Sequence, residues 1–399
     1  MPWITPLLQS PSDQITPAMP ELAEVSRIVY LIRYHLVGKT LSKVQVQPDD
    51  IIYGKAGTSA VEFQKAMQGK KVVGAGQQGK YFWVTMASPP HAVLHFGMAG
   101  WLKVKDADTY YYRSEGKADD QEWPPKYWKF LLEMDDEEKT QAAFVDFRRL
   151  SRIRLVDCPA EEIRQHSPLK ENGPDPVADK NIVTEEWLAS KLHAKRVPVK
   201  AFLLDQANIS GIGNWMGLVL DIMTTIIAYT LIVSSDEILY HAKIHPEQHS
   251  NTLSGDQIKQ LDSSIHYVCD TSVGLLADSE KFPENWIFKH RWGKGKKNHP
   301  SRLPNGDKIS YIKVGGRTSA VVDSVQKKSG PNTENGTDTK TAPKRKRAAA
   351  PEKDAEEGEE AEEGGKPEKK TSSKRKSKKE DEQTAKTASS GSRRSTRTR

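Results

Sequence analysis

The stretch PELAEVSRIVYLIRYHLVG, residues 20–38, has the apolar spacing of one amphipathic helix. Its apolar side chains recur at three- and four-residue intervals, so they share one face that can pack against a core. Gly38 follows them and can adopt the left-handed conformation that ends a helix. The side chains on this face are Leu22, Val25, Ile28, Val29, Ile32 and Leu36. The fold is therefore expected to begin with a helix near residue 20.

Short β-type runs follow this helix and are separated by Gly, Pro and Asp, a pattern typical of a β-sandwich. After them, Asn172–Pro176 (NGPDP) has the composition of a linker. The runs are Lys71–Val73, Tyr81–Met86, Ala92–Phe96, Trp128–Met134, Ala142–Phe147 and Arg152–Val156. The first half of the chain is therefore expected to be a helix plus a sandwich.

The pattern becomes helical from Thr184, which can cap a first helix, and Pro198 can open the next one. Residues 211–214 form a Gly-Ile-Gly-Asn turn, with Asn214 in position to cap the helix that follows. Farther on, residues 308–314 and 318–322 flank Gly315-Gly316, which predicts a β-hairpin. The second half is therefore expected to be helical, with a terminal hairpin.

The segment from Gln326 onward contains no aromatic residue and no Leu, Ile, Val, Met or Cys. It cannot bury apolar surface, so we expect a disordered tail. This tail carries 21 Lys and Arg against 14 Asp and Glu, which accounts for the whole net charge of +7. The folded part is therefore neutral overall, and nucleic-acid binding by that part requires a local basic face.

Two cysteines, Cys158 and Cys269, are too few for a disulfide framework or a four-cysteine zinc site, which fits a reducing intracellular compartment. Residues 1–18 contain no Lys or Arg and resemble neither a signal peptide nor an Arg-rich transit peptide.

The sequence Met19-Pro20-Glu21-Leu22-Ala23-Glu24-Val25 resembles the amino terminus of the formamidopyrimidine-DNA glycosylase and endonuclease VIII (Fpg/Nei) family, usually Met-Pro-Glu-Leu-Pro-Glu-Val. In that family the initiator Met is removed and the exposed proline nitrogen is the nucleophile. The resemblance implies that Pro20 attacks a sugar C1′ carbon, that Glu21 donates a proton to the sugar ring oxygen, and that Glu24 assists. A free α-amine has a pKa near 8, so much of it is unprotonated at neutral pH. The alternative is that Pro20 only starts a helix with an acidic first turn.

Further motifs resemble the same family. Gln78-Gly79-Lys80-Tyr81 is similar to its Gly-Lys-Tyr turn, which implies that Lys80 contacts the phosphate beside the lesion and helps proton transfer. His95-Phe96-Gly97-Met98-Ala99-Gly100 and Asp146-Phe147-Arg148-Arg149-Leu150 are similar to the motifs that fill the gap left by a flipped base. The resemblance implies that Met98, Arg148 and Leu150 form this wedge, although Leu150 replaces the usual aromatic residue. The alternatives are a hairpin lysine on the surface and a methionine packed in the core.

The stretch from Lys200 to Asn214 is the most specific match and resembles the family's helix–two-turns–helix motif. The resemblance implies that Asn214 and Lys200 bind backbone oxygens flanking the lesion. Residues 288–325 keep the terminal hairpin but lack the family's four zinc-binding cysteines, so they resemble the zincless finger of eukaryotic members. Arg317 at its tip is then expected to grip a phosphate, and no metal or cofactor is expected. A solvent-exposed turn arginine is the alternative.

The sequence departs from the family pattern at two places. Pro20 is internal here and its nitrogen is a tertiary amide, so we hypothesise that Met19 is the true start and that residues 1–18 are a misassigned extension. A largely apolar block of 18 residues with a single charge, Leu218–Ser235, also interrupts the family's helix after Gly217. A membrane helix is disfavoured inside a DNA-binding motif. A translated intron is favoured over a natural insertion, because its excision restores GNWMGDEILYHAKIHP.

The expected fold class is α+β, with a helix plus β-sandwich, a helical DNA-binding domain, a zincless hairpin and a disordered tail. The expected boundaries are 1–18 extension, 19–157 catalytic domain, 158–180 linker, 181–287 helix–two-turns–helix domain with the insertion at 218–235, 288–325 finger and 326–399 tail. DNA is expected to bind in a cleft between the first two domains.

The expected activity is that of a bifunctional DNA glycosylase and abasic-site lyase that acts on oxidised bases in double-stranded DNA. A nuclear monomer is expected, with import factors binding the basic tail and no membrane association. The alternatives are a non-catalytic damaged-DNA-binding protein and a chromatin-associated tail protein.

Overall fold

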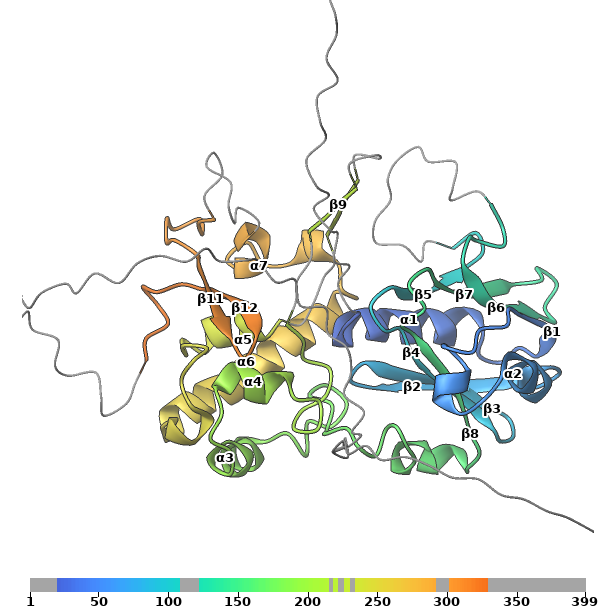
Figure 1. Cartoon of the computed structure of the whole chain (residues 1–399), viewed down its shortest axis with the longest axis horizontal. Coiled ribbons are helices and arrows are strands. Elements are labelled where there is room, and N and C mark those ends of the chain that lie inside the picture. Colours follow the sequence, from blue (N-terminus) through green and yellow to red (C-terminus); the bar gives the residue numbers. More distant parts are fainter. Residues whose placement is uncertain are drawn as a thin grey trace, which may run out of the picture. The chain divides into compact units, whose positions relative to one another are not determined.

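The computed structural model describes residues 20–107, 122–214, 218–221, 226–229, 234–291 and 301–328. All of them belong to one compact unit, Met1–Thr337. Figure 1 labels the helices and strands along the chain. The expected extension at residues 1–18 and the tail beyond residue 328 lie outside the described residues.

The predicted first helix is confirmed as α1 (Leu22–His35), and Gly38 behind it has the predicted left-handed backbone with φ +93°. The buried face of α1 is shared between two hydrophobic cores. Leu22 and Ala23 pack into the core of the helical half, whereas Val25, Ile28 and Ile32 pack into the core of the sandwich. The N-terminus of α1 is therefore held where the two halves of the fold meet.

The sandwich consists of two antiparallel four-stranded sheets, in the orders β1-β6-β7-β5 and β2-β3-β4-β8. Its strands are β1 (Leu41–Val46), β2 (Val72–Gln78), β3 (Tyr81–Met86), β4 (His91–His95), β5 (Gly100–Val104), β6 (Trp128–Met134), β7 (Gln141–Asp146) and β8 (Arg152–Val156). Phe63 of α2 (Ala60–Met67), Phe130 and Phe144 form a chain of ring contacts 5.0 and 5.2 Å apart. Each buried phenylalanine contributes roughly 1.5–3 kcal/mol of burial free energy.

The β-runs predicted from sequence all correspond to strands, whereas β1, β5 and α2 were not predicted. Strand β1 (LSKVQV) carries Lys, Ser and Gln among its apolar residues, and β5 begins at a glycine. Their pairing in the sheet overrides these weak local preferences.

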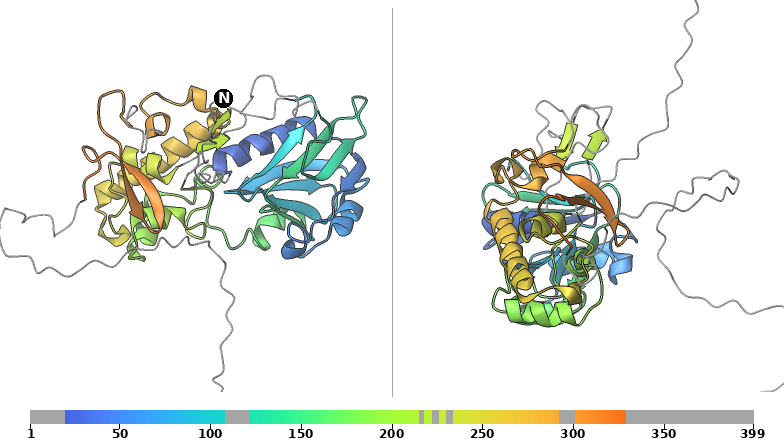
Figure 2. Two further views of the ribbon diagram at one scale, coloured as in Figure 1. Left: turned by 45° about the horizontal axis from the view of Figure 1, so that its top comes forward. Right: turned by 90° about the vertical axis from the view of Figure 1, so that its left-hand side faces the viewer.

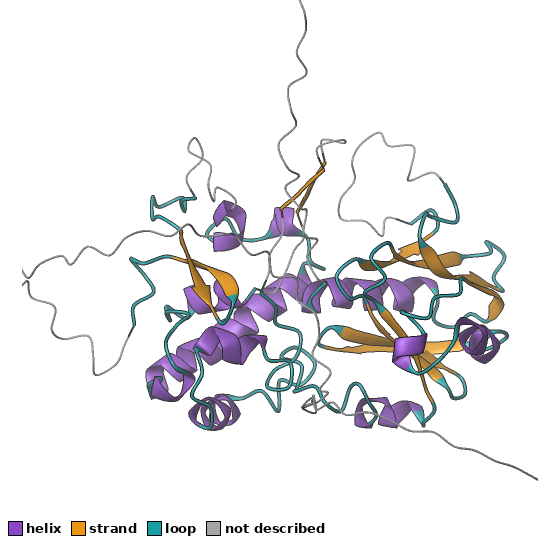
Figure 3. Cartoon of the chain, viewed as in Figure 1, coloured by secondary structure: helices purple, strands orange, loops and turns teal. Residues whose placement is uncertain are grey.

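The helical half contains α3 (Glu185–His193), α4 (Val199–Leu204), α5 (Ser235–His241), α6 (Gly255–Gly274) and α7 (Ile287–His290), and Figure 3 colours the helices purple. The predicted caps are confirmed at α3, where Thr184 Oγ1 accepts the Trp187 N–H at 3.3 Å, and at α4, where Pro198 is the N-cap. Helix α6 packs against α1, α3 and α5 and joins them in the second core.

The expected linker between the halves is packed against the fold. Ile163, in a 3₁₀ segment at Ala160–Gln165, and Leu169 are buried under the second sheet, and the Arg164 guanidinium pairs with Asp179. The chain between the halves is therefore anchored by both apolar burial and charge.

Two hairpins complete the described chain. Strands β11 (Ser310–Val314) and β12 (Arg317–Val321) confirm the predicted hairpin and its Gly315-Gly316 turn; they are orange in Figure 2. Strands β9 (Leu218–Asp221) and β10 (Ile226–Tyr229) pair within the insertion. Among the described residues, no helix is both long and apolar enough to cross a membrane.

The prediction of a tail that starts at Gln326 is wrong by a few residues. Gln326 is buried; its side chain accepts the Val322 N–H and donates to the Ile244 carbonyl, and Lys328 pairs with Glu247. Hydrogen bonds order this polar segment without burial of large apolar side chains.

Candidate active site

The N-terminus of α1 places two carboxyl groups beside Pro20, which is buried. Glu21 is the N-cap residue, and its backbone N–H donates to Glu24 Oε2 at 2.7 Å. Both glutamates are almost fully buried. Amide groups at a helix N-terminus disfavour positive charge, so a free amine at this end of α1 would be held toward its neutral, nucleophilic form.

The turn that precedes the insertion lies directly against Glu21. A Cβ atom added to Gly213 would stand 1.6 Å from Glu21 Oε1, so only glycine leaves room for this carboxylate. The Leu22 N–H also donates to the Gly211 carbonyl at 3.3 Å. The predicted glycine turn therefore meets the predicted acid through contacts between residues nearly 200 positions apart in the sequence.

The turn that carries Lys80 meets the same place from a third segment. Gly79 has φ +58°, and a Cβ there would lie 2.6 Å from the Gly211 nitrogen. Its N–H donates to Asp175 Oδ2 at 2.8 Å. Burial raises the pKa of Asp175, although hydrogen bonds from backbone N–H groups oppose this increase. Asp175 comes from the packed linker and was not predicted to contribute to the site.

Lys80 is buried, and burial lowers the pKa of its ammonium. The negative charges of Glu21 and, more weakly, Glu24 raise the pKa of Lys80, whereas the positive charge of Arg317 lowers it further. These four groups therefore lie within electrostatic reach of one another. All four residues belong to separate sequence motifs, and the fold brings them together.

His95, which was not predicted as a site residue, lies in the same region. Burial, reinforced by the positive charges of Lys80, Arg154 and Arg152, lowers the pKa of its imidazole to about 3. His95 Nδ1 accepts the Gly97 N–H at 3.0 Å. The imidazole is therefore neutral at pH 7 among three cations, an arrangement suited to a phosphate. The two-residue spacing of the arginines on β8 was the available signal, since it places both on one face of the strand.

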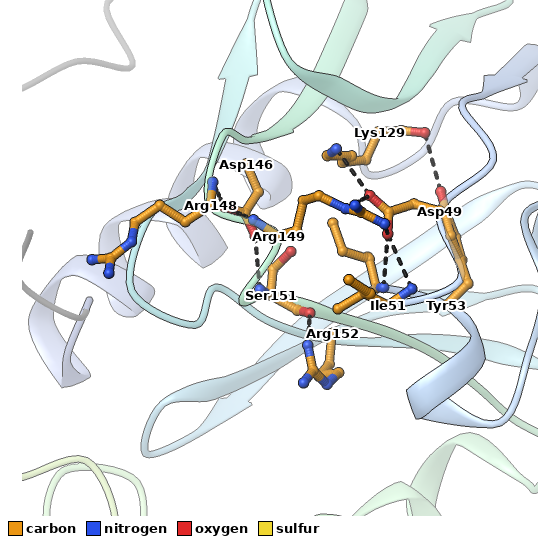
Figure 4. A network of polar contacts seen from close by, with 10 residues as sticks. Asp49, Ile51, Tyr53, Lys129, Asp146, Arg148, Arg149, Ser151 and Arg152 are labelled. Atoms are coloured by element: carbon orange, nitrogen blue, oxygen red, sulfur yellow. Dashed lines mark hydrogen bonds and ion pairs between the residues drawn. The ribbon is translucent and has the colours of Figure 1, made fainter. Parts of the chain in front are cut away.

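The loop Asp146–Ser151 has a rigid base, shown in Figure 4. The Asp146 carboxylate accepts the backbone N–H groups of Arg148, Arg149 and Ser151 at 2.7–3.0 Å. Arg149 has φ +59°, and its guanidinium donates to both oxygens of Asp49 at 2.9 and 3.0 Å. Burial raises the pKa of Asp49, but hydrogen bonds from Arg149 and Lys129 outweigh it and lower the pKa to about 2.

The expected wedge side chains beside this base are exposed to different degrees, and Arg148 is half-buried with its Nη1 atom buried. In Figure 4 the guanidinium of Arg148 points away from the Asp49 network, and its Nη1 has no hydrogen-bond partner among the described residues. Leu150 is 39% exposed. A Cβ on Gly97 would lie 2.3 Å from the Leu150 carbonyl oxygen, so the loop with the half-buried Met98 packs against the loop with Leu150. The three side chains therefore stand on adjacent loops.

The expectation that Lys200 contacts DNA is wrong for this structure. Its side chain is 0% exposed, and its Nζ donates to Asp236 Oδ1 at 2.8 Å and to the Thr318 carbonyl at 2.9 Å. Asp236 also accepts from Arg291 and from the Ala320 N–H. Lys200 therefore attaches the β11–β12 hairpin to α4 and α5, and burial lowers its pKa. Arg317 at the hairpin tip is exposed.

The expectation that Asn214 caps the following helix is also wrong. The N-cap of α5 is Ser234, whose hydroxyl accepts the Asp236 N–H at 3.2 Å. The Ser235 N–H donates to the Gly213 carbonyl at 3.0 Å, so the two ends of the insertion meet. Asn214 is buried, and its Oδ1 has no hydrogen-bond partner within the described part of the chain. The insertion thus separates this asparagine from the helix.

Comparison with known proteins finds one family repeatedly. The model of the formamidopyrimidine-DNA glycosylase N-terminal domain matches residues 19–153. The chain is 35% identical over 337 residues to the formamidopyrimidine-DNA glycosylase of Arabidopsis thaliana, covering 84% of this chain and 77% of that protein. It is 31% identical over 247 residues to that of Pediococcus pentosaceus, covering 62% and 75%.

Solved structures show the same fold at low sequence identity. The Lactococcus lactis enzyme bound to DNA with an abasic site matches with a TM-score of 0.58 and 22% identity, over 77% of this chain and all of that one. A complex of the L. lactis enzyme with DNA that contains a formamidopyrimidine lesion matches with a TM-score of 0.56 and 21% identity, over the same shares.

Proposed function

The chain belongs to the formamidopyrimidine-DNA glycosylase family, and we propose that it removes an oxidised base and then nicks the strand through Pro20. Membership makes it a DNA glycosylase of base-excision repair. The lyase step, the covalent intermediate and the role of each residue are our proposal. Damaged double-stranded DNA is the proposed substrate, as in the L. lactis complexes.

The observation that carries the proposal is the meeting of three distant segments beside Pro20. The Glu21 carboxylate lies against Gly213, the Gly79–Lys80 turn packs on Gly211, and Lys80 lies within electrostatic reach of Glu21. A nucleophile needs an acid and a cation nearby to protonate the leaving oxygen and to bind phosphate. These groups supply both functions.

The proposed reaction requires a secondary amine at Pro20. Its lone pair forms a bond to C1′ as the bond between C1′ and the base breaks. The departing base keeps that electron pair and takes the proton that the amine nitrogen loses. Glu21 protonates the ring oxygen as the sugar opens, which gives an iminium. Water takes a C2′ proton as the 3′ phosphate leaves by β-elimination, and water takes a C4′ proton as a second elimination expels the 5′ phosphate.

DNA is held by groups around this centre. We propose that Arg317 and the neutral His95 with its neighbouring cations contact phosphates, while Met98, Arg148 and Leu150 fill the gap in the stack. The β11–β12 hairpin is proposed to act as a zincless finger. Within the described residues, no cluster of three or more His, Cys, Asp or Glu could hold a metal ion.

We propose that the active form starts at Pro20, after removal of Met19, and lacks Leu218–Ser235 as the product of a spliced message. Asn214 is proposed to bind phosphate only in that form, where helix α5 follows it directly. A nuclear monomer is proposed, with import factors recognising basic clusters such as Lys374–Lys379.

Borohydride trapping tests the enzyme. Protein that starts at Pro20 is incubated with duplex DNA that carries an oxidised base, and borohydride reduces the iminium to a stable protein–DNA adduct. We expect an adduct with this protein, much less with Pro20→Gly, and none with protein that starts at Met1. Absence of an adduct from the Pro20-starting protein, despite tight binding, would refute the covalent mechanism.

The second candidate is a damaged-DNA-binding protein without catalysis. It is favoured by one observation, that Pro20 follows Met19 in the chain as written and its amide nitrogen cannot attack. N-terminal sequencing of the protein purified from cells separates the two. A mature chain beginning at Met1 or Pro2 supports the binder, and one beginning at Pro20 supports the enzyme.

A further inference from the structure

Beside the loop that carries Arg148 and Leu150, two aromatic side chains stand exposed as a pair. Phe147 is 58% exposed and Tyr127 is 52% exposed. Their ring centroids are 6.3 Å apart, with the ring planes inclined by 52°. Aromatic rings exposed to water are less favourable than buried ones. A partner that covered both rings would therefore gain free energy of burial.

The backbone fixes the positions of both rings, although Tyr127 has an unfavourable conformation. Tyr127 has φ +63°, a left-handed conformation that is unfavourable for a bulky residue. Its carbonyl accepts the Asp146 N–H at 3.1 Å, so the segment with Tyr127 is tied to the residue that precedes Phe147. Asp146 in turn orders the loop through its three hydrogen bonds to backbone N–H groups. Neither ring therefore depends on a flexible support.

A lysine side chain lies over one ring of the pair. Lys126 is exposed, and its Nζ lies 5.1 Å from the centroid of the Tyr127 ring. The nearby carboxylates of Asp146 and Asp49 are buried, and each accepts several hydrogen bonds. Flat apolar rings beside a cation have the chemistry that binds an unpaired nucleobase next to its phosphate.

We infer that Tyr127 and Phe147 form a stacking surface for the base opposite the lesion, which loses its partner when the damaged nucleotide is everted. The inference rests on the proposed function, because only base flipping leaves such a base unpaired. Phe147 adjoins Arg148 in the chain, so it stands on the same loop as two of the residues proposed to fill the gap. This surface would read the undamaged strand, whereas Glu21 and Lys80 act on the damaged one.

The test compares binding of the full chain to two duplexes at one fixed salt concentration. Both carry a stable abasic analogue in one strand. In the first duplex the opposite nucleotide is intact, and in the second it also lacks its base. We expect Phe147→Ala to weaken binding to the first duplex about tenfold and to the second less than twofold, because the stacking partner is then missing.

Three further variants sharpen the comparison. Phe147→Tyr keeps a ring and should bind the first duplex within about threefold of the unmodified chain. Tyr127→Asn removes a ring while tolerating positive φ, and should show the same dependence on the opposite base. Tyr34→Ala is the matched control, because Tyr34 is 72% exposed and stacks with the exposed Tyr30 on α1; it should change neither affinity.

Equal weakening of both duplexes by Phe147→Ala would mean a structural role and would overturn the inference, as would no weakening of either. Failure of the proposed function looks different. In that case the unmodified chain would bind the abasic duplex no better than undamaged DNA of the same sequence, and the inference would fall with it.

Discussion

Gly213 is the position where a single added methyl group should disable the acid without unfolding the protein. In Gly213→Ala the new Cβ would stand 1.6 Å from Glu21 Oε1 and 1.9 Å from its Cδ. Ordinary contact needs about 3.5 Å, so the carboxylate must retreat by about 2 Å. Since misplacement by about 1 Å can cost about 100-fold in rate, we expect base excision to fall at least about 100-fold.

Stability should fall moderately in this variant. Gly213 is not among the positive-φ glycines, so alanine adds no backbone strain, but displacement of the buried Glu21 side chain should lower the unfolding free energy by about 1–3 kcal/mol. The assay is single-turnover excision from an oxidised duplex by protein that starts at Pro20, together with a thermal melt. Gly255→Ala is the control, because nothing lies within 4 Å of its added Cβ. A folded Gly213→Ala variant that excises within threefold of the unmodified rate would refute the placement of Glu21 as the acid.

Lys200→Met should lower the unfolding free energy in urea by about 3 kcal/mol because it breaks a buried ion pair, whereas Met at the exposed Lys313 should be nearly neutral. The pKa of His95, about 3 when folded, lies below its unfolded value near 6.5, so stability is lost as pH falls from 6.5 toward 3. Between pH 7.5 and 5 the unmodified protein should lose about 2 kcal/mol more than His95→Gln in denaturant titrations, and equal losses would contradict the neutral imidazole. Deletion of Leu218–Ser235, which also removes the Ser234 cap, should leave the melting temperature equal or higher and reduce light scattering, because Gly213 already lies beside the start of α5 and Asn214 can then cap it; a variant that fails to fold would show the insertion to be structural.

The departures between expectation and structure have identifiable physical causes. Lys200 was assigned to DNA because it stands in a matching motif, but Asp236, 36 positions away, neutralises it inside the protein. Asn214 was expected to cap α5, but Ser234 is the N-cap because the insertion places a serine directly before the helix. In both cases a tertiary neighbour replaced the partner that the local pattern indicated.

His95 and Asp175 were missed for a related reason. Neither residue type is unusual at its position. The role of His95 arises from the three cations around it, and that of Asp175 from the hydrogen bond that it accepts from the Gly79 N–H. A perturbed pKa depends on desolvation and on distances to charges, and the tertiary structure sets both.

The amino-acid sequence alone determined α1, the alternating strands, the Gly315-Gly316 hairpin and the motifs that name Pro20, Glu21 and Lys80, because periodicity and turn chemistry act over a few residues. Only the tertiary structure decided which of these motifs meet. Packing of the two cores on one helix places Gly213 against Glu21 and buries Lys80 and Lys200. These contacts form only when the buried surfaces of several segments pack against one another. The free energy of burial therefore depends on all of those segments together and cannot be assigned to one of them.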